Sequence, residues 1–340
     1  MKFRALADTG VFVSELCLGA MTFGGKGQIW ENIGGLDQAA ADGIVHRALD
    51  AGINFVDTAD VYSAGESETM VGKAIAGRRH DLVLATKVRG RMGPGPNQVG
   101  LSRLHIVASV EASLRRLNTD YIDLYQIHRS DSVTNIEDTL RALDDLVRAG
   151  KVRYIGCSNL PAWHLMKALA VSREQRLERF RCTQSFYSLA GRDLERETIP
   201  LLKDQGLGLL VWSPLAGGFL SGKFTRTGGD ESARRAKFDF PPVNKEKGFD
   251  VLDVLITIAA AHGVTVPQIA LAWILANEAV TSVIIGARKI AQLDDNLKSI
   301  DVTLTAEELK QLDEVSKLTV EYPAWMDSLG TDRRPGERRY

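Results

Sequence analysis

The sequence predicts an α/β fold in which eight strands alternate with eight helices and close into a (β/α)8 TIM barrel. Short apolar runs recur along the chain, amphipathic segments lie between them, and the alternation repeats eight times. The runs are nearly continuous in apolar character, as in parallel strands covered on both faces. They are LCLGA from Leu16, INFVDTA from Ile53, LVLATKV from Leu82, IDLYQIH from Ile122, VRYIGCSN from Val152, CTQSFYS from Cys182, LGLLVWSPL from Leu207 and TSVIIGA from Thr281.

Several intervening helices have recognisable ends. Asn135 is expected to cap a helix that stops before Gly150, which occupies the position favoured by a C′ glycine. Ser102 is expected to open another helix, with Ile106 and Val110 on its buried stripe. Ser67 is expected to cap a third, whose inward residues are Met70, Val71, Ala74 and Ile75.

Three segments fall outside the alternation, and all belong to one domain over residues 1–340. Residues 1–14 predict an N-terminal β-hairpin that plugs the barrel floor. Residues 216–247 form a long loop after the seventh strand, a length typical of lids and binding loops. Thr305 and Glu308 form a capping box that predicts an extra C-terminal helix.

Composition argues against nucleic-acid and membrane partners. The 340 residues carry 42 Lys+Arg and 43 Asp+Glu, a net charge of −1, so no basic footprint is present. The arginines near the C-terminus (Arg333, Arg334, Arg338 and Arg339) are interpreted as a solvated tail. The chain start lacks a signal-peptide apolar core, and no run has the length of a membrane span. Together with three apparently buried free thiols (Cys17, Cys157 and Cys182), this predicts a cytoplasmic protein.

Polar residues stand at the predicted carboxyl ends of the strands, where barrel enzymes carry their chemistry. In order they are Asp57, Lys87, His128, Ser158 with Asn159, Gln184, Trp212 with Ser213, and Gly286 with Ala287 and Arg288. Tyr62 follows Asp57 by five residues. A lysine beside a phenol favours the phenolate, so the pattern predicts a Tyr62 with a lowered pKa and general acid character.

Motifs that are missing narrow the choice. No G-x-G-x-x-G follows the first strand, which argues against a Rossmann dehydrogenase. P-loop, G-x-S-x-G and H-E-x-x-H patterns are also missing, and the six histidines are dispersed without ligand spacing. We therefore expect no metal, although a carboxylate–histidine site on a barrel stays open as an alternative, as does an aldolase with Lys87 as its Schiff base.

Six ordered motifs resemble those of the aldo-keto reductases. They are GINFVDTADVY from Gly52, ATKV around Lys87, LYQIHRSD around His128, GKVRYIGCSN from Gly150, WSPLAGGFLSGK from Trp212 and VIIGARKIAQLDDNL from Val283. The resemblance runs from LGAMTFG near Leu18 to the helix after Thr305, and the long seventh loop is similar to the aryl-aldehyde and general aldehyde reductase subgroup.

The resemblance implies a role for each matching residue. Tyr62 would be the general acid, Lys87 and Asp57 its tuning pair, and His128 the group that orients the carbonyl. Ser158, Asn159 and Gln184 would bind the nicotinamide carboxamide, with Trp212 stacked on the ring. Further cofactor contacts would come from Met21, Thr22, Asp57, Ser213, Leu215, Gly217, Lys223, Gly286, Ala287, Arg288, Gln292 and Asn296.

The resemblance also implies NADPH rather than NADH, because Arg288 stands where the family meets the 2′-phosphate, and a small carbonyl compound as substrate. Phe23, Trp30 and Trp325 are expected to line the substrate pocket. Two alternatives stay open: NAD(P)⁺-dependent oxidation of a hydroxyl compound, and a redox-sensing regulatory subunit like the potassium-channel β subunits. The sequence does not predict an oligomeric state.

Overall fold

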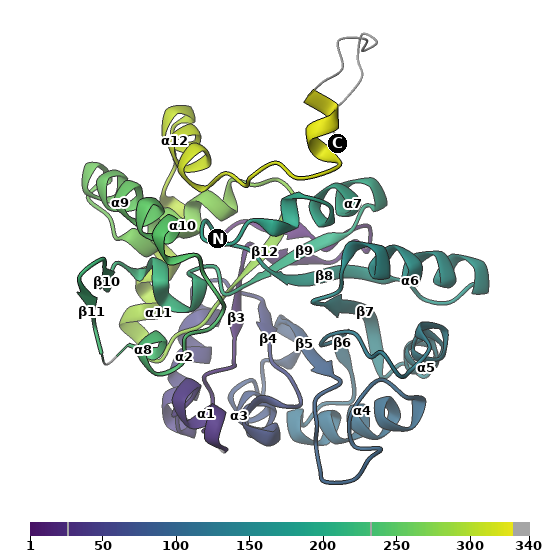
Figure 1. Ribbon diagram of the computed structural model, residues 1–340. Coiled ribbons are helices and arrows are strands. Elements are labelled where there is room, and N and C mark those ends of the chain that lie inside the picture. Colours follow the sequence, from purple (N-terminus) through teal and green to yellow (C-terminus); the bar gives the residue numbers. More distant parts are fainter. Residues whose placement is uncertain (26, 232, 329–340) are drawn as a thin grey trace.

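The eight predicted barrel strands are present and parallel. A computed structural model describes residues 1–25, 27–231 and 233–328, and in it the strands close into a ring in the order β3-β4-β5-β6-β7-β8-β9-β12, surrounded by helices (Figure 1). The strands are β3 (Leu16–Gly19), β4 (Phe55–Asp57), β5 (Val83–Val88), β6 (Ile122–Ile127), β7 (Val152–Ser158), β8 (Phe180–Phe186), β9 (Gly208–Trp212) and β12 (Val280–Ile285).

The strand ends lie within three residues of the sequence prediction, and the largest difference is at the end of β9. β8 begins at Phe180, two residues before the predicted Cys182. β9 ends at Trp212 rather than at Leu215, because Ser213 has a left-handed φ of 52° that no strand residue can hold. The early end of β9 turns the chain into the long loop directly at the barrel mouth.

The helices cover the outside of the barrel. Those between and after the strands are α2 (Gln38–Asp50), α3 (Glu66–Ala74), α4 (Arg103–Leu117), α5 (Ile136–Arg148), α6 (Ala162–Gln175), α7 (Thr198–Gln205), α9 (Lys245–His262), α10 (Val266–Leu275) and α11 (Ile290–Leu297). Short 3-10 turns are η1 (Tyr62–Gly65), η2 (Arg79–Asp81), η3 (Asp193–Glu195) and η5 (Lys298–Asp301). The caps predicted at Asn135 and Ser102 are confirmed, since their side chains accept from the Glu137 and His105 amides.

The predicted cap at Ser67 is wrong. The cap position is Gly65, two residues earlier, and α3 begins at Glu66, because Gly65 with a φ of +91° reverses the chain there. Ser67 lies inside the first turn, where its hydroxyl donates to the Ala20 carbonyl oxygen at 2.7 Å. The residue therefore ties α3 to the loop after β3 instead of capping its own helix.

The N-terminal hairpin closes the barrel floor as predicted. β1 (Phe3–Ala5) pairs antiparallel with β2 (Phe12–Ser14). Leu6 and Val13 are fully buried and pack with barrel-interior side chains such as Phe55, Leu124 and Leu210. The lower interior is consequently a dry apolar layer, and ligands can approach only from the opposite end.

The long segment after β9 folds into η4 (Ala216–Ser221), β10 (Phe224–Thr225), β11 (Gly228–Gly229) and α8 (Arg234–Lys237). α8 contacts α1 (Gln28–Ile33), which follows β3. The segment thus reaches from the end of β9 to the loop after β3 and lies across part of the barrel mouth.

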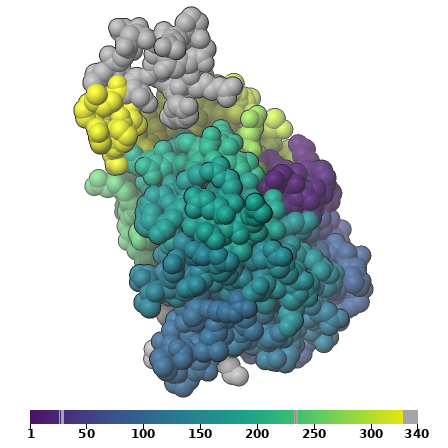
Figure 2. Space-filling model, turned by 90° about the vertical axis from the view of Figure 1, so that its right-hand side faces the viewer, coloured from purple at the N-terminus to yellow at the C-terminus, as the bar shows by residue number. Residues whose placement is uncertain are grey.

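The C-terminal end adds the predicted helix, α12 (Ala306–Ser316), with the Thr305–Glu308 capping box in place. A further turn, η6 (Ala324–Ser328), stands outside the helix ring beyond α7, and both views show this yellow segment at the edge of the molecule (Figure 1, Figure 2). The arginine-rich end predicted to be a solvated tail lies outside the described residues.

Two composition-based expectations have structural outcomes. Cys17, Cys157 and Cys182 are buried free thiols, as predicted. Within the described ranges no single helix has the length and apolar character to cross a membrane; α9 and α10 pass that test only as a pair bent by 99°.

Candidate active site

The barrel interior changes from apolar to polar within two residues along its strands. Side chains two residues apart in a strand share a face. Phe55, Ala85, Leu124, Cys182 and Leu210 belong to the lower apolar layer. Two positions later stand Asp57, Lys87, Gln126, Gln184 and Trp212, so the strand period itself gathers four predicted residues, together with Gln126, into one layer at the carboxyl ends.

Asp57, Lys87 and Tyr62 form a hydrogen-bonded group in this layer. The fully buried Lys87 ammonium donates to Asp57 Oδ2, to the Thr58 carbonyl oxygen at 2.8 Å and to the Tyr62 hydroxyl oxygen at 3.3 Å. All three ammonium protons are used. Because the Tyr62 oxygen accepts the bond from Lys87, its own proton is left for another acceptor.

Burial governs the pKa values of this group. It raises the pKa of Tyr62, and the charge of Lys87 only partly offsets that effect while Asp57 adds to it. The prediction that Lys87 lowers the pKa of Tyr62 below its ordinary value is therefore wrong, because burial outweighs the effect of the lysine. Burial also opposes the charge of Lys87, but Asp57 and Tyr62 outweigh it and raise the Lys87 pKa. At neutral pH the group holds a protonated phenol beside an ammonium.

His128 and Trp30 flank the Tyr62 ring. The His128 ring lies edge-on at 5.7 Å between centroids, and the Trp30 ring lies at 5.4 Å. Burial, followed by the positive charges of Lys87, Arg129 and Arg89, lowers the pKa of His128 to about 3. His128 is hence a neutral imidazole at physiological pH, able to donate a hydrogen bond but not to supply a proton as an imidazolium.

An amide network surrounds the Asp57–Lys87–Tyr62 group. Gln184 Nε2 donates to Asp57 Oδ1 at 2.7 Å, and Gln126 Nε2 donates to the same atom at 3.3 Å. Asn159 Nδ2 donates to the His128 carbonyl oxygen and to Ser158 Oγ, while its Oδ1 accepts from the Trp212 indole at 3.0 Å. The network fixes the amide orientations and connects four strand ends to the rim residue Trp212.

The remaining predicted cofactor residues come from the loops after β3, β9 and β12 and from α11. Ser213 Oγ accepts from the Gly217 amide at 2.8 Å. This bond closes the turn between β9 and η4, and Leu215 is the residue that directly precedes η4. Thr22 Oγ1 donates to the Ala287 carbonyl oxygen at 3.0 Å and so joins the loops after β3 and β12. Gln292 Oε1 accepts from the Arg288 amide at 3.0 Å. Met21 and Gly286 belong to the same two loops, Asn296 is buried on α11, and Lys223 lies 3.8 Å from Asp230.

Two of the three predicted substrate residues do not line the mouth. Phe23 is fully buried in the hydrophobic core, and its carbonyl oxygen accepts from Ser63. Trp325 lies on η6, outside the helix ring, where its ring packs against Tyr322. Of the three, Trp30 is the residue whose ring packs against Tyr62.

Three residues near the site were missed by sequence reasoning. Gln126 has a detectable signal, since it lies two positions before His128 on the same strand face. Phe240 stacks on Trp212 with rings 9° apart and centroids at 5.8 Å. The buried Arg235 holds that segment in place by donating to the Ala216 and Pro241 carbonyl oxygens and pairing with Asp239. Phe240 and Arg235 come from the long loop, where spacing indicates nothing about contacts.

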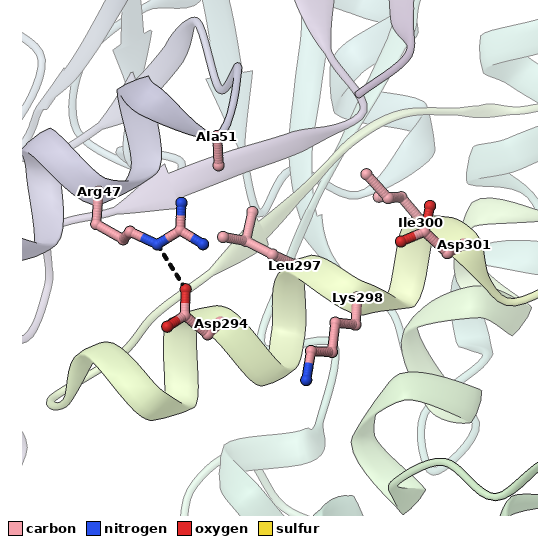
Figure 3. Close-up of a pocket in the computed structure, with 7 residues that line it drawn as sticks. All are labelled: Arg47, Ala51, Asp294, Leu297, Lys298, Ile300 and Asp301. Carbon is pink, nitrogen blue, oxygen red and sulfur yellow. Dashed lines mark hydrogen bonds and ion pairs between the residues drawn. The ribbon is translucent and has the colours of Figure 1, made fainter.

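A surface hollow lies away from the Asp57–Lys87–Tyr62 group. About 450 Å³ of open space lies between α2 and the α11–η5 segment, lined by Arg47, Ala51, Asp294, Leu297, Lys298, Ile300 and Asp301 (Figure 3). Arg47 Nε donates to Asp294 across it at 2.7 Å. Asp57, Tyr62, Lys87 and His128 are not among the residues that line this hollow.

The order of these residues matches a known family. The profile described as Aldo/keto reductase family covers residues 15–317. The chain belongs to this family. It is 39% identical over 93% of its length to the uncharacterized oxidoreductase YrpG of Bacillus subtilis (strain 168), 96% of which is covered. An aldo/keto reductase of this kind is an oxidoreductase on a barrel, which explains the missing dinucleotide glycine motif.

Two further relatives differ in their printed roles. A probable voltage-gated potassium channel subunit beta of Arabidopsis thaliana is 38% identical, with 89% of this chain and 92% of the relative covered. The versiconal hemiacetal acetate reductase of Aspergillus parasiticus is 34% identical, with 92% and 96% covered. The family therefore holds, at similar identity, an enzyme that acts on a small molecule and a protein assigned to a channel.

Proposed function

We propose that this protein reduces aldehydes or ketones to alcohols with NADPH, using Tyr62 as the general acid. The observation that carries the proposal is the bonding of Lys87, which donates to both Asp57 and the Tyr62 oxygen. A carbonyl oxygen placed against Tyr62 would receive the phenolic proton, and neutral His128 would donate a second hydrogen bond to it.

The protein's part in the reaction is proton transfer and charge stabilisation. The carbonyl carbon receives a hydride, which bound NADPH supplies, and the carbonyl oxygen receives the proton of Tyr62, so the product is an alcohol. The tyrosinate that remains is stabilised by the Lys87 ammonium, whose charge is balanced by Asp57. The reaction thus needs no change in the protonation of Lys87.

The polar set at the mouth fits a nicotinamide cofactor. Gln184 Oε1 and the second lone pair of Asn159 Oδ1 are acceptors for a carboxamide NH₂, and Trp212 offers a flat indole for ring stacking. Ser213, Leu215, Gly217 and Lys223 would follow the pyrophosphate, with Met21, Thr22, Gly286 and Ala287 opposite. Arg288 would meet the 2′-phosphate, with Gln292 and Asn296 toward the adenine.

The walls of the mouth favour an aromatic or otherwise apolar carbonyl compound. Trp30 packs on the Tyr62 ring, and Phe240 stacks on the Trp212 indole. This pairing supports the aryl-aldehyde and general aldehyde reductase subgroup proposed from the loop motifs. The reductase among the relatives, which acts on versiconal hemiacetal acetate, agrees with a small-molecule substrate.

The protonation state of Tyr62 favours reduction over oxidation. Alcohol oxidation needs a phenolate to accept a proton, whereas burial raises the Tyr62 pKa and keeps the phenol protonated at neutral pH. NAD(P)⁺-dependent oxidation of a hydroxyl compound is therefore the weaker direction near pH 7.

A second candidate is a redox-sensing regulatory subunit, which the likeness to the Arabidopsis thaliana channel β subunit favours. The same site would then bind NADPH chiefly to report the cofactor's redox state. Turnover separates the two functions, because a regulatory subunit need only bind the cofactor.

The test combines cofactor titration with turnover. Purified protein is titrated with NADPH and NADH by quenching of tryptophan fluorescence, and 4-nitrobenzaldehyde is then added to follow cofactor oxidation. We expect Tyr62→Phe to bind NADPH like the wild type and to lose about 10²- to 10⁴-fold in kcat. Tight binding without turnover of any carbonyl would transfer the assignment to the regulatory function, and no binding would reject both.

Cofactor preference is tested at Arg288. Losing a charged hydrogen bond of about 1.5–3 kcal/mol should weaken NADPH binding by about 10- to 100-fold in Arg288→Ala, with NADH binding unchanged. Arg153→Ala, which changes an exposed arginine on β7, is the matched control. An Arg288→Ala variant that keeps the full preference for NADPH contradicts the assignment.

A further inference from the structure

Asp60 is a buried carboxyl group that the proposed mechanism does not use. It lies in the loop after β4, two residues before Tyr62, and is fully buried. Among the described residues neither carboxyl oxygen has a hydrogen-bond partner, although the adjacent Val61 amide is close enough to favour the charged form weakly. Its own amide donates to the Lys87 carbonyl oxygen at 3.2 Å, so Asp60 sits directly behind the catalytic group.

The charged groups around Asp60 are committed elsewhere. Glu68 on α3 is also fully buried, and it accepts from Arg116 Nε on α4 at 2.7 Å and from Thr86 Oγ1 on β5 at 2.6 Å. Lys87, the other nearby cation, is bonded to Asp57. An ionised Asp60 would be a second buried carboxylate beside Glu68 with no cation of its own, a state that costs several kcal/mol.

Tyr125 on β6 provides the matching group. Its hydroxyl is fully buried and also has no partner among the described residues. Asp60 lies near enough to contribute to the raised pKa of Tyr125, after burial itself. A protonated carboxyl group and a phenol each carry one donor and one acceptor, so together they can satisfy each other.

We propose that Asp60 is a neutral carboxylic acid that hydrogen-bonds Tyr125 through one buried water, and that this link makes Asp60 a positioning residue for Tyr62. The role rests on the proposed function of Tyr62 as the general acid. The protonation of Asp60 does not, because it follows from burial and from the partners already taken.

The turn that carries Tyr62 has a strained backbone, so it needs side-chain hydrogen bonds to fix it. Ser63 and Ala64, which follow Tyr62, have left-handed φ values of 49° and 54°, a conformation that is strained for residues with a Cβ. Ser63 Oγ donates to the Phe23 carbonyl oxygen at 3.0 Å and fixes the turn on its far side. Asp60 would fix the near side, so the phenol is held between two attachment points.

The charge state of Asp60 has a pH signature. Burial, followed by Glu68, raises its pKa well above the ordinary value, with Arg116, Val61 and Lys87 opposing. The native state therefore binds a proton that the unfolded chain has released, and the free energy of unfolding falls as pH rises above about 4. An asparagine at this position keeps the shape and carries no titrating group.

The experiment compares Asp60→Asn, Asp60→Ala and Tyr125→Phe by urea unfolding at pH 5 to 9 and by kinetics. We expect Asp60→Asn to unfold at a higher urea concentration than the wild type, with a difference that grows with pH. Its kcat should stay within about twofold of the wild-type value. Asp60→Ala should lower kcat by about tenfold, since small misplacements of reacting groups are costly, and change NADPH affinity less than twofold. Tyr125→Phe should show a smaller loss of kcat in the same direction.

Three results would overturn the proposal. They are an Asp60→Asn variant less stable than the wild type at pH 8, a constant stability difference across the pH range, or unchanged kcat in both Asp60→Ala and Tyr125→Phe. If Asp60→Ala does not fold, Tyr125→Phe decides the kinetic question. If the wild type reduces no carbonyl, the proposed function fails, and the unfolding series still decides the protonation of Asp60.

Discussion

The lower and upper layers of the barrel interior are built from the same strands yet have opposite chemistry. Leu124 and Leu210 lie in the dry layer that the N-terminal hairpin seals, whereas Gln126 and Trp212, two positions later, belong to the polar layer at the mouth. In the lower layer, the free energy of unfolding falls when a buried methyl group is removed. In the upper layer, it falls when a buried charged group loses its partner. A strand period of two thus separates stability from chemistry over a single step of the chain.

The largest expected effect comes from breaking the upper layer at Lys87. Lys87→Met leaves the buried Asp57 carboxylate without its cation, so we expect the free energy of unfolding to fall by about 3–5 kcal/mol. Reduction should also slow by about 10²- to 10⁴-fold. Urea unfolding and single-turnover kinetics measure both, with Lys73→Met on the exposed face of α3 as the control. A stable and active Lys87→Met variant would contradict the charge pairing.

The corresponding substitution in the lower layer should lower the free energy of unfolding without changing kcat. Leu124→Ala removes a fully buried side chain, so the free energy of unfolding is expected to fall by about 2–5 kcal/mol. Because no catalytic atom is touched, kcat at 25 °C should stay within about twofold. Leu104→Ala, at a side chain 63% exposed on α4, should change stability by less than about 0.5 kcal/mol. A large loss of kcat in Leu124→Ala would mean that the layers are coupled.

A pH series sharpens the comparison, because the upper layer also holds His128. With its pKa near 3 in the fold and about 6.5 in the unfolded chain, the native state binds fewer protons between these values. The free energy of unfolding should therefore fall with decreasing pH across that window, by at most about 1.4 kcal/mol per pH unit from this residue. His128→Asn should reduce the slope, and His80→Asn, at an exposed histidine, is the control variant.

The smallest effects are expected in the loops above the layers. Phe240→Ala removes a stack on Trp212 worth about 0.5–1.5 kcal/mol, so NADPH affinity or the KM for an aromatic aldehyde should change by about 2- to 10-fold. Trp325→Ala should leave both within twofold, because η6 lies outside the helix ring. The reverse ranking of these variants would show that the C-terminal segment closes over the mouth.

Regular alternation made the fold and most of the site predictable. Asp57, Lys87 and Gln184 end apolar runs, so their convergence followed from the barrel alone. Trp325 could not be placed, because the tail is held by long-range contacts such as Arg196 with Glu321. The raised pKa of Tyr62 was equally out of reach, since burial depends on packing from several loops. Periodicity predicts which face of a strand or helix a residue occupies, but not how deeply its side chain is buried.

Arg235 has a consequence for how the long loop opens. One nearly buried guanidinium joins Ala216, Asp239 and Pro241, so these parts of the loop detach together or not at all. Trypsin cleaves after arginine only when the side chain and its flanking backbone are free. Arg235 therefore makes the closed loop resistant to cleavage after its own position, and the rate of nicking there follows the population of the open loop when opening and closing are fast relative to cleavage.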